Sequence, residues 1–153
     1  MLSGFHRRNS PVDSEQIKVI EDRFGVLFPE SYRKFLLAFN GGEPVEGLFP
    51  IDGFENNPDD LIQAFFGVRV TEPTEDLSEI LLMLEGLTPS GFIPIARTAG
   101  DDFVCLDLRK EGYPVVYWDR RPFWGNNIWR EEYLYPVADN FEDLLAKLQE
   151  SPY

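Results

Sequence analysis

Histidine and cysteine, the side chains that do most nucleophilic and general-base chemistry near neutral pH, are almost absent from this sequence. Each occurs once among the 153 residues, as His6 and Cys105. One histidine and one cysteine cannot assemble a zinc site, and a single cysteine cannot form an internal disulfide. The GxSxG, GxGxxG and GxxxxGKS/T motifs of hydrolases and nucleotide-binding proteins are missing as well. We therefore expect no enzyme activity, no catalytic residue, no cofactor and no metal.

Long apolar runs and positive charge are also scarce. No stretch approaches the roughly 20 apolar residues of a membrane span, and the first residues, MLSGFHRRNSP, lack the apolar centre of a secretory signal. Only 14 lysines and arginines stand against 27 acids, a formal net charge of −13, which disfavours nucleic acids and anionic membranes as partners. A cationic partner is the natural complement, although solubility alone also explains such a charge. The single cysteine is typical of a cytoplasmic protein.

The first half of the chain carries two clear helix signals. Asp13 is a suitable N-cap with Gln16 as its capping-box partner, and Gly25 can end that helix. Pro29 begins a second helix, which Asn40-Gly41-Gly42 can end with residues in the left-handed conformation. Inward positions of these helices and of later elements predict a core that contains Phe24, Tyr32, Phe35, Leu36, Phe39, Val104, Leu106, Phe141 and Leu145.

The remaining elements are short apolar runs between turn residues. Strands are expected over 47–51, 61–70, 92–96, 103–108, 115–118 and 135–137. A turn at Asn56-Asn57-Pro58 separates the first two strands. Thr74 caps a third helix, and Asp139 or Asn140 caps the last. This order predicts an α+β fold: a single domain over residues 1–153, with 1–12 as a flexible lead-in, and a largely antiparallel twisted sheet packed against about four helices.

Acidic residues are concentrated in one segment of the chain. Residues 43–85 hold eleven acids against Arg69 alone, which accounts for ten of the thirteen net negative charges. Opposite potentials steer the encounter of two proteins, so a segment of this kind can attract a cationic partner. The alternative is a solvated helix face, which has the same composition. The candidate binding residues of this segment are Asp59, Asp60, Glu72, Glu75 and Glu79.

A second candidate surface is the loop from Asp119 to Tyr133, which is rich in aromatic residues and arginine. Tryptophan and arginine are enriched among the residues that dominate binding energies, and loops commonly carry binding residues. The alternative is that the tryptophans fold back as a lid on the core. The candidate binding residues of this loop are Arg120, Arg121, Trp124 and Trp129.

Carboxylates are the only abundant reactive groups, and the pairs to consider as a catalytic dyad are Asp59-Asp60 and Asp101-Asp102. Adjacent residues on a strand point to opposite faces, and aspartates in turns usually accept hydrogen bonds from backbone N–H groups. We therefore expect turn chemistry at both pairs. Two carboxylates converging in one pocket would favour a hydrolase.

Five segments resemble the SUKH superfamily, the relatives of the fungal glucan-synthesis regulators. Residues 27–36, LFPESYRKFL, and the following Asn40-Gly41-Gly42 are similar to its LP-x-x-Y-x-x-F-L…NGG signature, with Phe28 inserted between leucine and proline. Residues 93–96, 100–108 and 115–119 follow in the expected order. The last of the five segments, residues 137–145, VADNFEDLL, has Asn140 where serine is common. The resemblance covers residues 14–149.

The resemblance implies a single α+β domain that binds other proteins and transfers no catalytic residue. Its bacterial members are commonly immunity proteins, which neutralise polymorphic toxins, often nucleases, by direct contact. Its fungal members regulate cell-wall synthesis and carry long flanking extensions, which this sequence lacks. The sequence thus predicts a cytoplasmic bacterial immunity protein with a cationic toxin domain as its partner. The alternative is a regulatory or scaffold protein that binds a signalling or cell-wall-synthesis partner.

Overall fold

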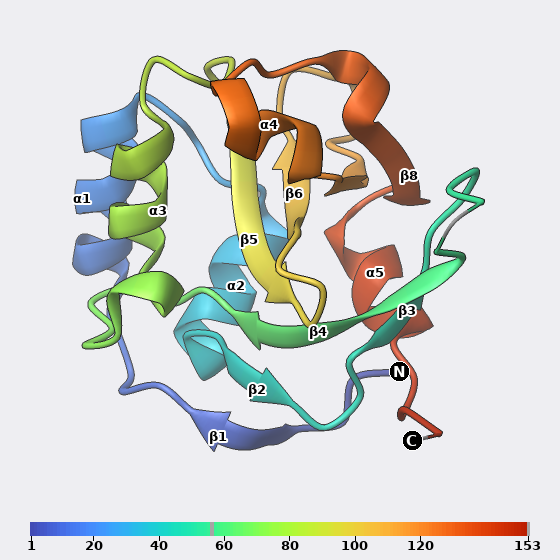
Figure 1. The fold of residues 1–153 in the computed structure, drawn as a ribbon. Coiled ribbons are helices and arrows are strands. Elements are labelled where there is room, and N and C mark those ends of the chain that lie inside the picture. The colour runs from blue at the N-terminus through green and yellow to red at the C-terminus, as the bar shows by residue number, and fades with distance from the viewer. Residues whose placement is uncertain (56, 153) are drawn as a thin grey trace.

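The computed structural model describes residues 1–55 and 57–152, and it has the predicted α+β architecture (Figure 1). The strands of the sheet lie in the order β1-β2-β4-β5-β6-β7-β8, and neighbouring strands are antiparallel. The short strand β3 is outside this order and pairs antiparallel with β4. The strands are β1 (Phe5–Arg8), β2 (Gly42–Pro44), β3 (Leu48–Pro50), β4 (Asp59–Phe65), β5 (Phe92–Thr98), β6 (Phe103–Asp107), β7 (Val115–Trp118) and β8 (Leu134–Ala138).

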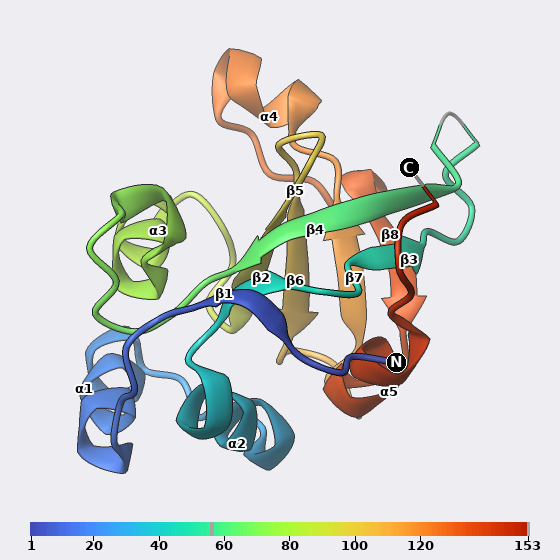
Figure 2. The same cartoon turned by 90° about the horizontal axis from the view of Figure 1, so that it is seen from below.

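Helices cover both faces of this sheet. They are α1 (Ser14–Phe24), α2 (Glu30–Phe39), α3 (Leu77–Leu84), α4 (Arg121–Asn126) and α5 (Phe141–Lys147), with short 3-10 turns at Pro73–Glu75 and Glu131–Tyr133. Figure 2 shows α2 and α5 on one face and α4 on the other, while α1 and α3 lie at one side. The start and end of the chain lie close together, because Leu2 N–H donates to the carbonyl of Leu145.

The flexible lead-in expected over residues 1–12 is wrong, because residues 5–8 form the edge strand β1. The Phe5 ring packs on Phe39 with the ring centroids 4.9 Å apart, so it anchors the strand to α2. The Arg7 guanidinium forms ion pairs with Glu43 and Glu75. One apolar residue in a polar stretch has no periodicity, so the pattern could not reveal this strand.

The two N-terminal helices form as predicted, and the reasons are local. Asp13 and Gln16 form the capping box, and Gly25 ends α1 in the left-handed conformation. Asn40, Gly41 and Gly42 all have positive φ after α2. A Cβ on Gly41 would lie 2.5 Å from the carbonyl oxygen of Phe66, so only glycine fits there.

The start of the third helix and the end of one strand differ from the prediction. The cap of the third helix is Asp76, not Thr74, because a 3-10 turn over Pro73–Glu75 precedes the helix and the Asp76 carboxylate accepts from the N–H of Glu79. The predicted strand over 61–70 is β4, which ends at Phe65, and β2 was not predicted. Of the turn predicted before β4, Asn56 lies outside the described residues.

The core lies between the sheet and its helices. Six of the nine predicted core residues are buried, and the others, Phe24, Phe39 and Leu145, are only partly covered. The last helix begins after Asn140, whose side chain accepts from the N–H of Asp143. The strands β5, β6 and β7 match their predicted positions and are almost wholly buried. They form the rigid base from which the loop after β7 projects.

Candidate functional site

The two tryptophans of the loop from Asp119 to Tyr133 differ in how far they are buried. Phe123 of α4 packs edge-on against Trp118, 5.1 Å between ring centroids, which fixes the helix on the sheet. Trp129 is half-buried and contacts the ring of Phe92 at 5.4 Å, so it acts as the lid that was one alternative. Trp124 is 49% exposed. Of the two tryptophans only Trp124 is available to a partner.

The two arginines before α4 also differ. The Arg120 guanidinium lies 3.7 Å from the centroid of the Phe103 ring, and burial lowers its pKa below the ordinary arginine value. Its Nε–H is buried without a hydrogen-bond partner. The exposed Arg121 instead forms an ion pair with Asp119, with Nε 3.0 Å from Oδ1. Arg121 is therefore paired with a carboxylate of the protein, whereas Arg120 forms no ion pair with a described residue.

Two carboxylates, one from each sequence pair, converge on Tyr117. Its hydroxyl donates to Asp102 Oδ2 at 2.5 Å and lies 3.2 Å from Asp60 Oδ2. The other oxygen of Asp102 accepts from the backbone N–H of Arg120, and that of Asp60 accepts from its neighbour Leu61. Asp102 therefore connects the β5–β6 turn, β7 and the start of α4.

Asp102 and Tyr117 line a pocket of about 230 Å³ together with Phe54 and Arg121, and Asp60 is not part of its lining. The Tyr117 hydroxyl, which has one hydrogen to donate, lies within hydrogen-bond distance of both carboxylates, and the backbone N–H groups of Leu61 and Arg120 donate to their other oxygens. Burial raises the pKa of the Asp102 carboxyl. These hydrogen bonds are those of a structural junction. The turn position expected of Asp59-Asp60 is wrong, because these two residues begin strand β4 and pair with β3.

The acids of residues 43–85 do not form one surface. Glu75 is buried, and its carboxylate lies 2.5 Å from the guanidinium of Arg7. Glu72 and Glu79 are exposed beside it, whereas Asp59 and Asp60 lie at the other end of β4 (Figure 1). The structure thus brings Asp60 to the α4 side of the molecule and leaves the three glutamates apart from it.

The single cysteine and the single histidine show no sign of a reactive role. Cys105 is fully buried, and burial raises the pKa of its thiol well above the ordinary value. His6 is exposed on the edge strand β1. Within residues 1–55 and 57–152 no group of three potential metal ligands is brought together. The same residues include no helix long and apolar enough to cross a membrane.

Sequence reasoning missed Tyr117 and Arg97. Tyr117 lies in an apolar strand and carries no signal beyond its hydroxyl. Arg97 is a charged residue inside the otherwise buried strand β5, and its Nε–H is buried without a hydrogen-bond partner. A lone charge within an apolar strand was a detectable sign, because an unpaired buried cation is costly.

Comparison with known proteins agrees with this fold and with the motifs along the chain. The SPbeta prophage-derived uncharacterized protein YokK of Bacillus subtilis (strain 168) is 23% identical to this chain, over 91% of it and 76% of YokK. The SMI1 / KNR4 family (SUKH-1) matches residues 11–147, nearly the whole chain. The chain therefore belongs to the SMI1 / KNR4 family (SUKH-1).

Proposed function

We propose that the protein is an immunity protein that binds and neutralises a cationic toxin domain through the α4 surface, formed by Asp101, Arg120, Arg121, Trp124 and Ile128. The observation that carries the proposal is the exposure of Trp124 (49%) and Ile128 (46%) on a segment whose other aromatic residues are packed against the sheet. Exposed aromatic residues on a rigid base are typical anchors of a protein interface.

Family membership and charge support a toxin as the partner. Bacterial members of the superfamily are commonly immunity proteins, and YokK is prophage-derived. The net charge of −13 favours approach of a cationic protein. A nuclease fits this description, because a surface that binds phosphates is rich in lysine and arginine. In this role the protein acts in the cytoplasm by binding alone and needs no enzyme activity.

The test is co-expression with the product of the neighbouring open reading frame. If that product is toxic, wild-type protein restores growth and forms a complex with it. Trp124→Ala weakens rescue, whereas Tyr113→Ala, which removes an aromatic side chain of similar exposure (45%) at the other end of β7, does not. A complex without toxicity would favour the regulatory or scaffold role instead. No complex and no rescue would contradict the proposal.

A further inference from the structure

Two arginines beside α4 have no carboxylate partner. Neither Arg97 nor Arg120 takes part in an ion pair with any residue that the structure describes. Carboxylates within 3.1 Å neutralise other arginines of the chain: Arg7, Arg33, Arg109 and Arg121. Among the described residues Arg8, Arg23 and Arg69 also lack an ion pair, but all three are exposed to solvent. Arg97 and Arg120 are half-buried, so their lack of an ion pair needs a physical reason.

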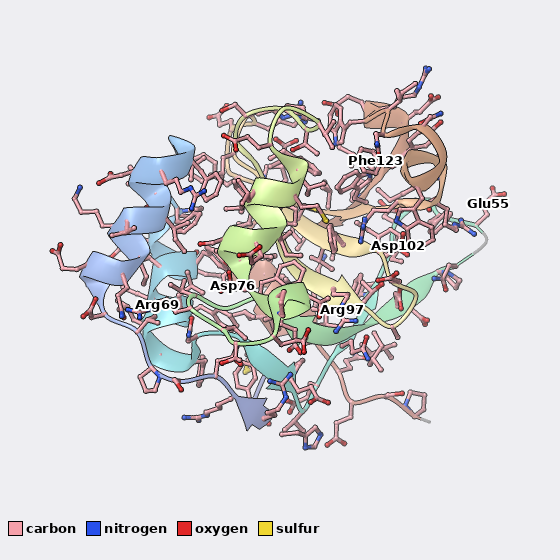
Figure 3. All side chains as sticks on the ribbon, turned by 60° about the vertical axis from the view of Figure 1, so that its left-hand side comes forward. Glu55, Arg69, Asp76, Arg97, Asp102 and Phe123 are labelled. Atoms are coloured by element: carbon pink, nitrogen blue, oxygen red, sulfur yellow. The ribbon has the colours of Figure 1, made fainter. Side chains whose placement is uncertain are left out.

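Arg97 and Arg120 are both neighbours of Phe103 on one face of the sheet. Arg97 of β5 is directly opposite Phe103 of β6, and opposite residues of an antiparallel pair point to one face. Arg120 stacks on the Phe103 ring from the segment that leads into α4. In Figure 3, Arg97 lies beside the turn that carries Asp102, below Phe123 of α4.

Both side chains are partly withdrawn from water, and both carry unsatisfied donors. The Nε–H groups of Arg97 and Arg120 are buried and unpaired, a state that normally destabilises a protein. A guanidinium that stacks on a ring keeps the N–H groups of its plane available at its edge. The Arg120 Nη1 group reaches only the carbonyl oxygen of Asp101, at a long 3.4 Å.

We propose that Arg97 and Arg120 together bind the carboxylate of an aspartate or glutamate side chain on the partner protein. A carboxylate accepts two parallel hydrogen bonds from guanidinium groups, and its charge offsets two neighbouring cations. Trp124 lies next to Arg120, with the guanidinium carbon 5.7 Å from the ring centroid, so it can exclude water from the contact. The inference rests on the proposed function, since it specifies a contact of the α4 surface.

The contact gives the interface selectivity that net charge cannot provide. An acidic protein attracts many cationic proteins, and attraction alone does not discriminate among them. A partner without a carboxylate at this position would place its own cations against Arg97 and Arg120, which opposes binding. Two isolated arginines on an acidic protein thus select one cationic partner from the others.

The first arm of the test needs no partner protein. Acetate is titrated into the full-length protein at constant ionic strength, with chloride as the balancing ion, and the Nε–H signals of the arginines are followed by NMR. The Arg97 and Arg120 signals should shift together and saturate at about 10 mM, a weak affinity suited to one carboxylate. The exposed Arg69 serves as the control and should not saturate.

Arg120→Lys keeps the charge but removes the planar fork, so saturation of the Arg97 signal should be lost. With the neighbouring gene product, Arg97→Lys and Arg120→Lys should each weaken binding about tenfold through faster dissociation, and Arg69→Lys should leave it unchanged. Shifts that stay linear in acetate, or an Arg97 shift that survives Arg120→Lys, would overturn the inference even if growth is rescued. Saturation by acetate without rescue would overturn the proposed function alone.

Discussion

The region around Glu72, Glu75 and Glu79 and the α4 surface both hold residues that the sequence marks as binding candidates, yet the structure uses them differently. In the first region, Glu75 and Asp76 serve the fold, one as the partner of Arg7 and the other as the cap of α3. On the α4 surface, Trp124 stays exposed and Arg120 stays unpaired. A high density of charge along the chain therefore does not identify a binding surface. Side chains that stay exposed or unpaired in the folded protein, such as Trp124 and Arg120, are the better guide.

The largest expected effect concerns the core that supports both regions. Phe35 contacts the rings of Phe65 and Phe141 at 4.9 and 5.1 Å and is buried. Phe35→Ala should lower the free energy of unfolding by about 3–5 kcal/mol, as is usual for an aromatic core truncation. Leu37→Ala on the exposed side of α2 is the control. A loss below about 1 kcal/mol in urea melts would show that the assigned face of α2 is wrong.

The next largest effect is a difference in stability loss between substitutions in the two regions. Asp102→Ala removes the acceptor of the Arg120 N–H and leaves the Tyr117 hydroxyl only the more distant Asp60 carboxylate, and it should cost about 2–4 kcal/mol. Glu72→Ala removes an exposed carboxylate and should change stability by less than about 0.5 kcal/mol. Equal effects of the two substitutions in denaturant melts would contradict the junction role of Asp102.

A smaller effect is expected where the chain leaves α2. Gly41→Ala should cost about 1–3 kcal/mol, because the residue has φ +77° and the new Cβ would meet the carbonyl oxygens of Phe65 and Phe66. Gly86→Ala is a matched control with the same φ and nothing within 4 Å of the new Cβ. Thermal melts in which the two variants lose equal stability would show that the backbone conformation alone accounts for the cost.

The smallest effect is a dependence of stability on pH that arises at the α4 junction. Burial raises the folded-state pKa of Asp102 above its value in the unfolded chain. Its contribution is therefore fully present below the unfolded-state pKa and is lost as pH rises through the folded-state pKa. Asp102→Asn cannot ionise, so the stability difference between wild type and variant should shrink as pH rises. A difference that stays constant from about pH 4 to pH 7 in urea melts would contradict this assignment.

Local signals were sufficient for much of the fold. The capping box at Asp13, the left-handed residues after α2 and the hairpin-linked strands β5 to β7 each depend on neighbours in the chain. The strand β1 was missed, because Phe5 is held by residues more than thirty positions away. The cap of α3 was misplaced by two residues, because both Thr74 and Asp76 are good caps and only the position of the 3-10 turn decides between them.

The candidate site was predictable only in part. The sequence identified the loop that holds Trp124, but the lid role of Trp129 depends on Phe92, a residue far away in the chain. The pairing of Asp60 with Asp102 joins one member of each sequence pair, which adjacency along the chain cannot reveal. Arg97 could not be predicted as a binding residue, because its proximity to Phe103 depends on strand pairing and Arg120 reaches Phe103 from a distant segment of the chain.

The central claim is that the α4 surface, and not the glutamates near α3, holds the partner. The most direct test measures association and dissociation rates with the neighbouring gene product for Trp124→Ala and for the double variant Glu72→Lys, Glu79→Lys, which leaves the Glu75–Arg7 pair intact. Trp124→Ala should speed dissociation by about tenfold or more. The double variant should slow association only about threefold at low salt, and not at high salt. Dissociation unchanged by Trp124→Ala, with association abolished by the double variant, would place the partner on the glutamates instead.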